Sequence, residues 1–191
     1  MEPVNARSVA VRQTWSLRVM TKMAICVALC CVMAYLSFPL PFTPGMVTAL
    51  TIAMNLAAFI LTPKQTFIVV LVWMLLGCAG VPVFIGGTAG FGKLFGPTGG
   101  FIFGFLAAYP VVSLFKGKTN SFRRYVLVAS LIGIPITYIG GLASMMLVMQ
   151  VNLQEGLIMA VFPYIPGDIM KAAFAAYLGT RLNKFFAQQE D

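Results

Sequence analysis

Long apolar segments, separated by short stretches that hold most of the charge, constrain this fold more than any other feature. Of the 191 residues, 60% are hydrophobic and 9% are charged, whereas a soluble domain carries about 25% charged residues. We therefore expect one all-α, polytopic membrane domain over residues 1–191, because a helix satisfies its own backbone hydrogen bonds in lipid. The predicted transmembrane helices are six, at approximately residues 19–37, 46–61, 65–79, 99–115, 123–149 and 166–186.

The basic residues predict the orientation of these helices. Eleven of the 13 Lys and Arg residues precede the first predicted helix, lie in alternate connections or close the last helix. Basic residues concentrate in cytoplasmic loops, so both termini are expected in the cytoplasm. Residues 38–45, a glycine-rich stretch and residues 150–166 are then expected to face outward. This pattern also explains the net charge of +8 without a nucleic-acid partner.

The composition excludes several kinds of chemistry. The sequence contains no histidine, which removes Ser-His-Asp and Cys-His catalysis and histidine-based metal sites. None of the four cysteines forms a C-x-x-C pair, so we expect small buried hydrophobic side chains rather than disulfides. No metal or cofactor is predicted.

A glycine-rich stretch at residues 77–104, GCAGVPVFIGGTAGFGKLFGPTGGFIFG, joins two apolar segments. Irregular backbone at membrane depth must be buried in protein or line a polar cavity, and such a cavity suggests a ligand. The run GTAGFGK resembles the start of a phosphate-binding loop, but Leu94 follows where the magnesium-binding hydroxyl is required. Nucleotide binding is therefore not expected. Gly100 and Gly104 predict a packing face for a neighbouring helix.

One acidic residue stands beside an apolar helix. Of the five acidic residues, three lie at the chain's ends and Glu155 falls in an outer connection, which leaves Asp168. Lys171 is three residues further on and shares its helix face. A charge in the membrane costs roughly 2.5–3.5 kcal/mol, so such charges usually face a cavity. The alternative is a structural ion pair, with Asp168 favouring the positive end of its helix.

Two blocks carry a resemblance to a known family. Residues 80–105, GVPVFIGGTAGFGKLFGPTGGFIFGF, resemble the pattern G-x-P-V-F-x-G-G-x-x-G followed by G-P-T-G-G-Y-x-x-G-F. Residues 163–176, PYIPGDIMKAAFAA, resemble P-F-x-P-G-D-x-x-K. Both patterns are typical of the BioY family, the biotin-binding membrane subunits of energy-coupling-factor (ECF) transporters. The chain departs from the family at Phe101 and Trp73, where tyrosine is usual, and at TPGMVTALT, which lacks a common Thr-x-Gln.

The resemblance implies an S component, the substrate-binding subunit of such a transporter, in the bacterial plasma membrane. It implies biotin uptake without enzymatic activity, because the expected partners supply the energy. These partners are a transmembrane coupling protein and two ATP-binding-cassette (ABC) ATPases. Ala24 and Ala28 match the small-residue motif with which such subunits meet the coupling protein.

The residues of these blocks give a hypothesis for the biotin site. Asp168 accepts hydrogen bonds from the ureido N–H groups, and Lys171 donates to the ureido carbonyl or to the carboxylate. The other polar end of biotin meets the backbone N–H groups of the glycine stretch, and aromatic side chains form apolar walls. The predicted backbone contacts are Gly86, Gly87, Thr88 and Gly90, and the predicted walls are Trp73, Phe84 and Tyr164.

Other readings stay open at this point. The departures from the family pattern are compatible with a subunit of the same fold that binds another small vitamin or metabolite. A small proton-coupled carrier would use Asp168 as its proton site. An intramembrane protease or lipid transferase is disfavoured, because the chain lacks histidine and has no paired acidic residues in its apolar segments.

Overall fold

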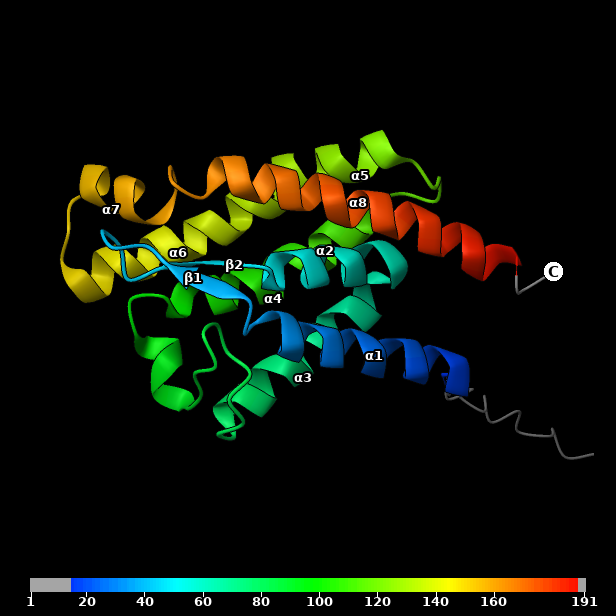
Figure 1. Cartoon of the computed structure of the whole chain (residues 1–191), viewed down its shortest axis with the longest axis horizontal. Coiled ribbons are helices and arrows are strands. Elements are labelled where there is room, and N and C mark those ends of the chain that lie inside the picture. The colour runs from blue at the N-terminus through cyan, green and yellow to red at the C-terminus, as the bar shows by residue number, and fades with distance from the viewer. Residues whose placement is uncertain (1–14, 189–191) are drawn as a thin grey trace, which may run out of the picture.

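The computed structural model describes residues 15–188 and is almost entirely helical, with one short hairpin (Figure 1). The predicted all-α fold class is confirmed. In chain order the elements are α1 (Leu17–Met33), β1 (Ser37–Pro39), β2 (Met46–Thr48), α2 (Leu50–Ile60), α3 (Pro63–Cys78), the 3-10 helix η1 (Phe91–Phe95), α4 (Gly99–Phe115), α5 (Phe122–Val128), the π-helical turn η2 (Ala129–Gly133), α6 (Ile134–Met149), α7 (Leu153–Ala160) and α8 (Ile165–Gln188).

The described helices differ in how far they could cross a membrane. By length and hydropathy, the continuous helix formed by α5, η2 and α6, Phe122–Met149, is the single one within residues 15–188 that qualifies alone. Helices α7 and α8 qualify together but are bent by 42° at their junction. Helices α2, α3 and α4 are apolar and shorter. The count of six spans therefore stays a prediction.

Three expectations about where helices begin and end are wrong, for reasons visible in the structure. Helix α1 ends at Met33 and α2 begins at Leu50, because residues 37–48 form an antiparallel hairpin in which Ser37 pairs with Thr48. Residues 150–166, expected as a connection, contain α7. A reciprocal cap starts α7: the Asn152 side chain accepts from the Glu155 N–H, and the Glu155 carboxylate accepts from the Asn152 N–H.

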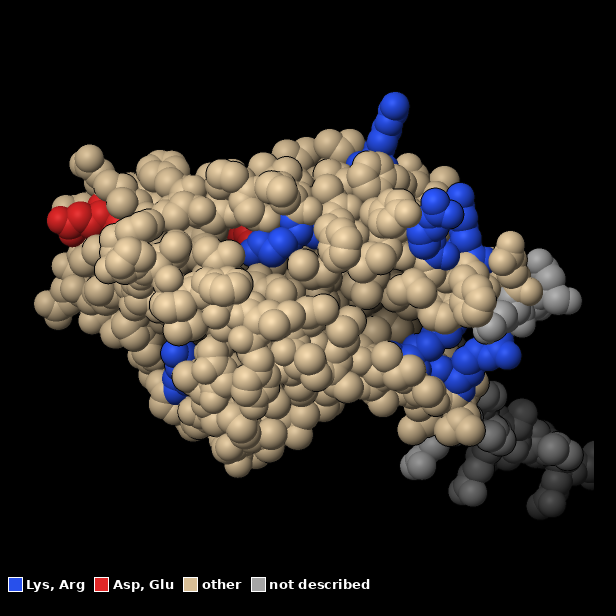
Figure 2. All heavy atoms as spheres, viewed as in Figure 1, with Lys and Arg blue, Asp and Glu red and all other residues tan. Residues whose placement is uncertain are grey.

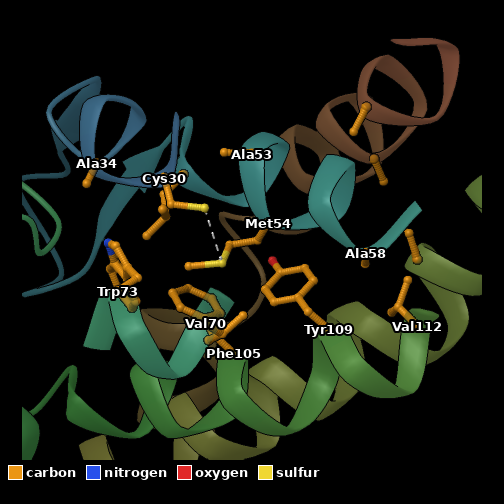
Figure 3. Close-up of a cluster of buried hydrophobic side chains, with 14 of the residues drawn as sticks. Cys30, Ala34, Ala53, Met54, Ala58, Val70, Trp73, Phe105, Tyr109 and Val112 are labelled. Atoms are coloured by element: carbon orange, nitrogen blue, oxygen red, sulfur yellow. Dashed lines mark hydrogen bonds between the residues drawn. The ribbon is translucent and has the colours of Figure 1, made fainter. Parts of the chain in front are cut away.

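Helix α2 lies at the centre of the bundle, between α1 and α8, and also packs on α4 (Figure 1). Most of its side chains are buried. Figure 3 shows the core on one side of α2, where Met54 points toward Cys30 of α1 and toward Trp73, Phe105 and Tyr109. The four cysteines are free thiols, as predicted.

The side chain of Lys116 caps the C-terminal end of α2. The Lys116 ammonium donates to the carbonyls of Ala58, Phe59 and Leu61, and the Ser113 hydroxyl also donates to Leu61. Burial lowers the pKa of Lys116 to about 8, so the amine is still mostly protonated at pH 7. These bonds satisfy carbonyls that the end of a helix leaves without partners, and they fix the sharp turn before Pro63.

Close contact between α4 and α6 depends on glycine. A Cβ atom added at Gly100 would lie 1.9 Å from the carbonyl oxygen of Gly140, and one at Gly104 would lie 3.0 Å from Thr137. The predicted packing face of Gly100 and Gly104 is confirmed. It brings the start of α4 and the middle of α6 together, and both helices contribute to the site described next.

Charge is distributed unevenly along the molecule. Figure 2 shows that Lys and Arg side chains gather at the end where the described chain begins and finishes, at the start of α1 and the end of α8. The hairpin and α7, which carries Glu155, lie at the opposite end. The orientation of the molecule in the membrane, expected from the same basic residues, stays a prediction.

Candidate functional site

A cavity lies toward the end of the molecule opposite the basic end, where five parts of the chain meet. They are the hairpin, the start of α2, the glycine stretch with the start of α4, the middle of α6, and the start of α8. The lining residues are Pro44, Gly45, Met46, Thr48, Thr51, Phe84, Ile85, Lys93, Thr98, Phe101, Ile102, Phe105, Thr137, Tyr138, Tyr164, Asp168 and Lys171. Because distant segments contribute, the site exists only in the folded bundle.

An ion pair on α8 provides the charged centre of this cavity. Lys171 Nζ lies 2.5 Å from Asp168 Oδ1, and both side chains are largely shielded from solvent. The hydroxyl of Tyr138, from α6, donates to Asp168 Oδ2 at 2.7 Å. Lys171 also donates to the carbonyl of Thr48, at the end of the hairpin, at 3.0 Å. Three elements thus fix the pair, and Lys171 keeps one N–H donor for a ligand.

The fold places this pair one turn into α8. The N–H of Asp168 donates to the carbonyl of Tyr164 at 2.8 Å, in the bend between α7 and α8. Pro166 fits the first turn of a helix, where a missing N–H costs nothing. The sequence order Pro-Gly-Asp therefore delivers a carboxylate at the start of a helix, near the positive end of its dipole.

A second cation lines the same cavity. Lys93 comes from η1, in the glycine stretch. Asp168 is the single acidic residue in the lining, and it already pairs with Lys171. Within residues 15–188, no acidic side chain lies within ion-pair distance of Lys93. The cavity therefore has a surplus of positive charge, which suits an anionic ligand group.

The rest of the lining is mostly apolar. Phe84, Phe101 and Phe105 contribute rings, and Tyr164 adds another from the α7–α8 bend. Gly45 allows the hairpin to approach this tyrosine, because a Cβ atom there would lie 2.3 Å from the Tyr164 hydroxyl. Apolar walls with a few fixed polar groups are typical of small-molecule sites.

Of the predicted site residues, the structure brings Asp168, Lys171, Phe84 and Tyr164 together at the cavity. Trp73 lies elsewhere. Its side chain is fully buried, its ring packs edge-on against Phe84 with 5.3 Å between centroids, and its indole N–H donates to the Val83 carbonyl. Trp73 was expected to form a wall of the cavity, but it packs behind that wall and supports it. The Phe84 ring lies between Trp73 and the cavity.

The glycine N–H groups are also arranged differently from the hypothesis. Gly86 donates to the Ala34 carbonyl, Gly87 to Phe84 and Gly90 to Gly77, at 2.8–3.0 Å. The Thr88 hydroxyl donates to the Ile85 carbonyl. None of these four residues lines the cavity. These internal hydrogen bonds occupy the backbone N–H groups of Gly86, Gly87 and Gly90, so the protein itself uses the groups expected to bind the ligand.

Sequence reasoning missed three groups that the cavity places near Asp168. Tyr138 lies within a long apolar segment, and its one signal was a hydroxyl at an otherwise hydrophobic position. The carbonyl of Thr48 becomes available through a hairpin that was not predicted. Lys93 is one of the two basic residues outside the stretches expected in the cytoplasm, but its part in a cavity depends on how the glycine stretch folds.

A helical membrane bundle with a small, charged cavity at one end is the architecture of a membrane substrate-binding subunit. A family model described as "BioY family" matches residues 7–188. The chain therefore belongs to the BioY family, as its motifs predicted.

Named relatives cover nearly the whole chain. A protein of Bacillus subtilis named "Probable biotin transporter BioY" is 35% identical, over 86% of this chain and 90% of its own length. "Biotin transporter BioY2" of Lactococcus lactis is 31% identical, over 91% and 98%. "Biotin transporter BioY" of Thermotoga maritima is 32% identical, over 88% and 97%.

Two solved structures resemble the fold. One, described as the S-component for biotin from an ECF-type ABC transporter, superposes with a TM-score of 0.80 at 25% identity, covering 87% of this chain and 91% of its own. The other, an S component of a bacterial ECF transporter, gives a TM-score of 0.56 at 20% identity, covering 91% and 98%. The predicted S-component fold is confirmed.

Proposed function

We propose that this chain is the biotin-capturing subunit of an ECF-type transporter, working in the bacterial plasma membrane with both termini in the cytoplasm. The observation that carries the proposal is the Asp168–Lys171 pair, held by Tyr138 in a cavity that also contains Lys93. Family membership and the names of the relatives support biotin as the ligand.

The carboxylate of Asp168 fits the ureido group of biotin. Each carboxylate oxygen has more than one acceptor position, and Tyr138 and Lys171 use one on each oxygen. The remaining positions can accept the two ureido N–H groups, while the free donor of Lys171 reaches the ureido carbonyl. Hydrogen bonds to charged groups are worth about 1.5–3 kcal/mol each, which suits a high-affinity site.

Lys93 is the better partner for the carboxylate tail of biotin. The charge of Lys171 is already balanced by Asp168, whereas Lys93 has no acidic partner in the described part of the chain. The two lysines come from different elements, so they can hold opposite ends of one ligand. The Phe84, Phe101 and Phe105 rings then cover the apolar ring system and the chain between the two polar ends.

The energy for transport would come from partners. Ala24 and Ala28 lie exposed, one turn apart on α1, where small side chains allow another helix to come close. We assign this face to the transmembrane coupling protein, which would connect the subunit to two ABC ATPases. The subunit itself needs no cofactor under this proposal.

The test is calorimetry of biotin binding to the detergent-purified chain alone. We expect a dissociation constant between nanomolar and low micromolar. Asp168→Asn should weaken binding by about 10- to 100-fold, the equivalent of one or two charged hydrogen bonds. The control is Glu155→Gln, which removes an acidic charge on α7 outside the cavity and should change nothing.

Biotin methyl ester tests which lysine binds the carboxylate tail of biotin. It lacks the carboxylate, so it should bind the wild type more weakly than biotin does, and Lys93→Gln should remove that difference. An ester penalty that persists in Lys93→Gln would reassign the tail to Lys171. If the folded protein binds another small vitamin and no biotin, the fold assignment stands but the proposed ligand is wrong. The departure from the family pattern at Phe101 is compatible with that outcome.

A further inference from the structure

A groove unrelated to the ligand cavity runs between α1 and α8 at the basic end of the molecule. Helix α2 forms its floor, since α1 and α8 each pack on α2 (Figure 1). Its volume is about 590 Å³, within the range of sites for small molecules, about 300–1,000 Å³. Residues that shape it include Lys22, Ile25, Leu29, Ile60, Leu182 and Phe186.

The groove combines an apolar body with a cation. Ile25, Leu29, Ile60 and Leu182 present aliphatic surface. The ammonium of Lys22 lies 4.2 Å from the centre of the Phe186 ring. A long amphipathic side chain near a helix end can lay its stem on apolar surface and reach the headgroup level. Trp15, just before α1, is partly exposed, and tryptophan is typical of the membrane interface.

In the described part of the chain, basic side chains concentrate at this end. Within residues 15–188 the acidic side chains are Glu155 and Asp168, on α7 and at the start of α8. The last turns of α8 add Arg181 and Lys184, both exposed. Figure 2 shows the resulting blue cluster at this end of the molecule. The groove therefore offers apolar contact and nearby basic side chains to one and the same occupant.

We propose that this groove binds an acyl chain of an anionic phospholipid, whose phosphate lies at Lys22. A phospholipid has both features that the groove complements, a long apolar chain and a negative group at its end. The basic end is expected at the cytoplasmic leaflet, where anionic lipids attract nearby Lys and Arg side chains. The site is separate from the biotin cavity, and only its place in the cytoplasmic leaflet rests on the orientation given with the proposed function.

The lipid face of α1 differs from the face assigned to the coupling protein. Ile25 and Leu29 each follow Ala24 and Ala28 by one residue, which corresponds to a rotation of about 100° around the helix. A lipid can therefore occupy the groove while the small-residue face stays open. Bound there, it would hold α1 against α2 and α8 and stabilise the bundle.

The experiment compares phosphatidylglycerol with phosphatidylcholine of the same acyl chains, added to delipidated protein in detergent. Native mass spectrometry measures the retained lipid, and thermal unfolding measures its effect. We expect one phosphatidylglycerol to be retained and to raise the melting temperature more than phosphatidylcholine does. Lys22→Gln should lower the affinity about fivefold or more, whereas Lys22→Arg should retain it. The control Lys118→Gln removes an exposed lysine away from the groove.

Three results would overturn the proposal. Equal retention of both lipids would mean that the phosphate is not recognised, and an equal loss in Lys118→Gln would mean that the charge effect is diffuse. A photo-crosslinking residue at position 25, where the side chain is exposed, identifies the neighbour directly. Crosslinks to the chain's own first 14 residues or to a partner protein, rather than to lipid, would assign the groove to a different occupant. Circular dichroism of each variant confirms that it is folded.

Discussion

Asp168 is the residue on which the proposed ligand contact depends, and its carboxylate is oriented before any ligand arrives. Tyr138 and Lys171 bind its two oxygens from different directions, and the Thr48 carbonyl holds Lys171 in turn. A group fixed in its bound position spends little free energy on ordering when the ligand binds. Tyr138 therefore acts as a positioning residue, and its loss should weaken binding without disturbing the fold.

Tyr138→Phe tests this positioning role. The substitution removes the hydroxyl that donates to Asp168 at 2.7 Å and keeps the ring. We expect biotin affinity to fall by about 10-fold, since one hydrogen bond to a charged group is lost. The matched control is Tyr125→Phe, which removes a buried tyrosine hydroxyl bound to Asn183 at the other end of the bundle. Calorimetry of both variants measures the effect, and equal losses of affinity would argue against a specific role for Tyr138.

Trp73→Phe tests whether Trp73 supports Phe84 from behind or contacts the ligand itself. The change removes the hydrogen bond to Val83 and leaves space beside Phe84. We expect the free energy of unfolding to fall by about 1–3 kcal/mol, while the biotin dissociation constant changes less than about threefold below the melting temperature. Thermal unfolding and calorimetry measure the two quantities. A variant of unchanged stability that binds biotin 10-fold more weakly would place Trp73 against the ligand, as the sequence suggested.

The sequence predicted some site residues and could not predict others, for a physical reason. Asp168 and Lys171 were conspicuous because charge is costly in an apolar segment. Tyr138 and Trp73 lie within apolar stretches of their helices, where the neighbouring side chains are compatible with either the bilayer or the core, so only packing decides which face each one takes. The glycine N–H groups were misjudged because their internal acceptors come from Ala34, Phe84 and Gly77, two of them distant in sequence.

At the scale of helices and strands, proline and glycine marked most boundaries. The expected range 99–115 agrees with α4, and the continuous helix Phe122–Met149 begins one residue before its expected start. The hairpin was missed because three prolines in residues 39–44 indicate a turn, whereas the short pairing beside them depends on α1 and α2 to position it. Long-range pairing of three-residue strands has no local signal.

Gly100→Ala tests the glycine contact between α4 and α6. The added Cβ atom would overlap the carbonyl of Gly140, so the helices must separate. We expect the free energy of unfolding to fall by about 1–3 kcal/mol, with weaker biotin binding because both helices line the cavity. Gly92→Ala is the control, since a Cβ atom there meets nothing within 4 Å. Thermal unfolding in detergent compares them, and similar melting temperatures would mean that the α4–α6 contact is not tight.

At the scale of the whole molecule, the ligand cavity and the cluster of basic side chains lie at opposite ends. The cavity opens among the hairpin, η1 and the start of α8, while the basic side chains gather where α1 begins and α8 finishes (Figures 1 and 2). If the basic end lies in the cytoplasm, as we propose, the cavity lies toward the outer surface. Such a subunit would capture its ligand from outside before any partner acts.

Cysteine labelling measures this orientation independently of the ligand. In a variant whose four cysteines are replaced by alanine, we expect a cysteine at position 155 to react with a membrane-impermeant maleimide added outside intact cells. A cysteine at position 184 should react only after the cells are opened. Both side chains are exposed, on α7 and near the end of α8, so access to the reagent is set by the membrane. Labelling of position 184 alone in intact cells would reverse the orientation.

Biotin binding to sealed vesicles then tests whether the cavity faces the same side as position 155. Right-side-out vesicles should bind radiolabelled biotin without ATP, because capture needs only the folded subunit. Inside-out vesicles should bind it only after detergent opens them, since the charged carboxylate of biotin slows its passage through the bilayer. Vesicles with Asp168→Asn give the background. Suppose that sealed inside-out vesicles bind biotin although position 155 is labelled from outside in intact cells. The cavity would then also open toward the cytoplasm, and the subunit would alternate between two open states without its partners.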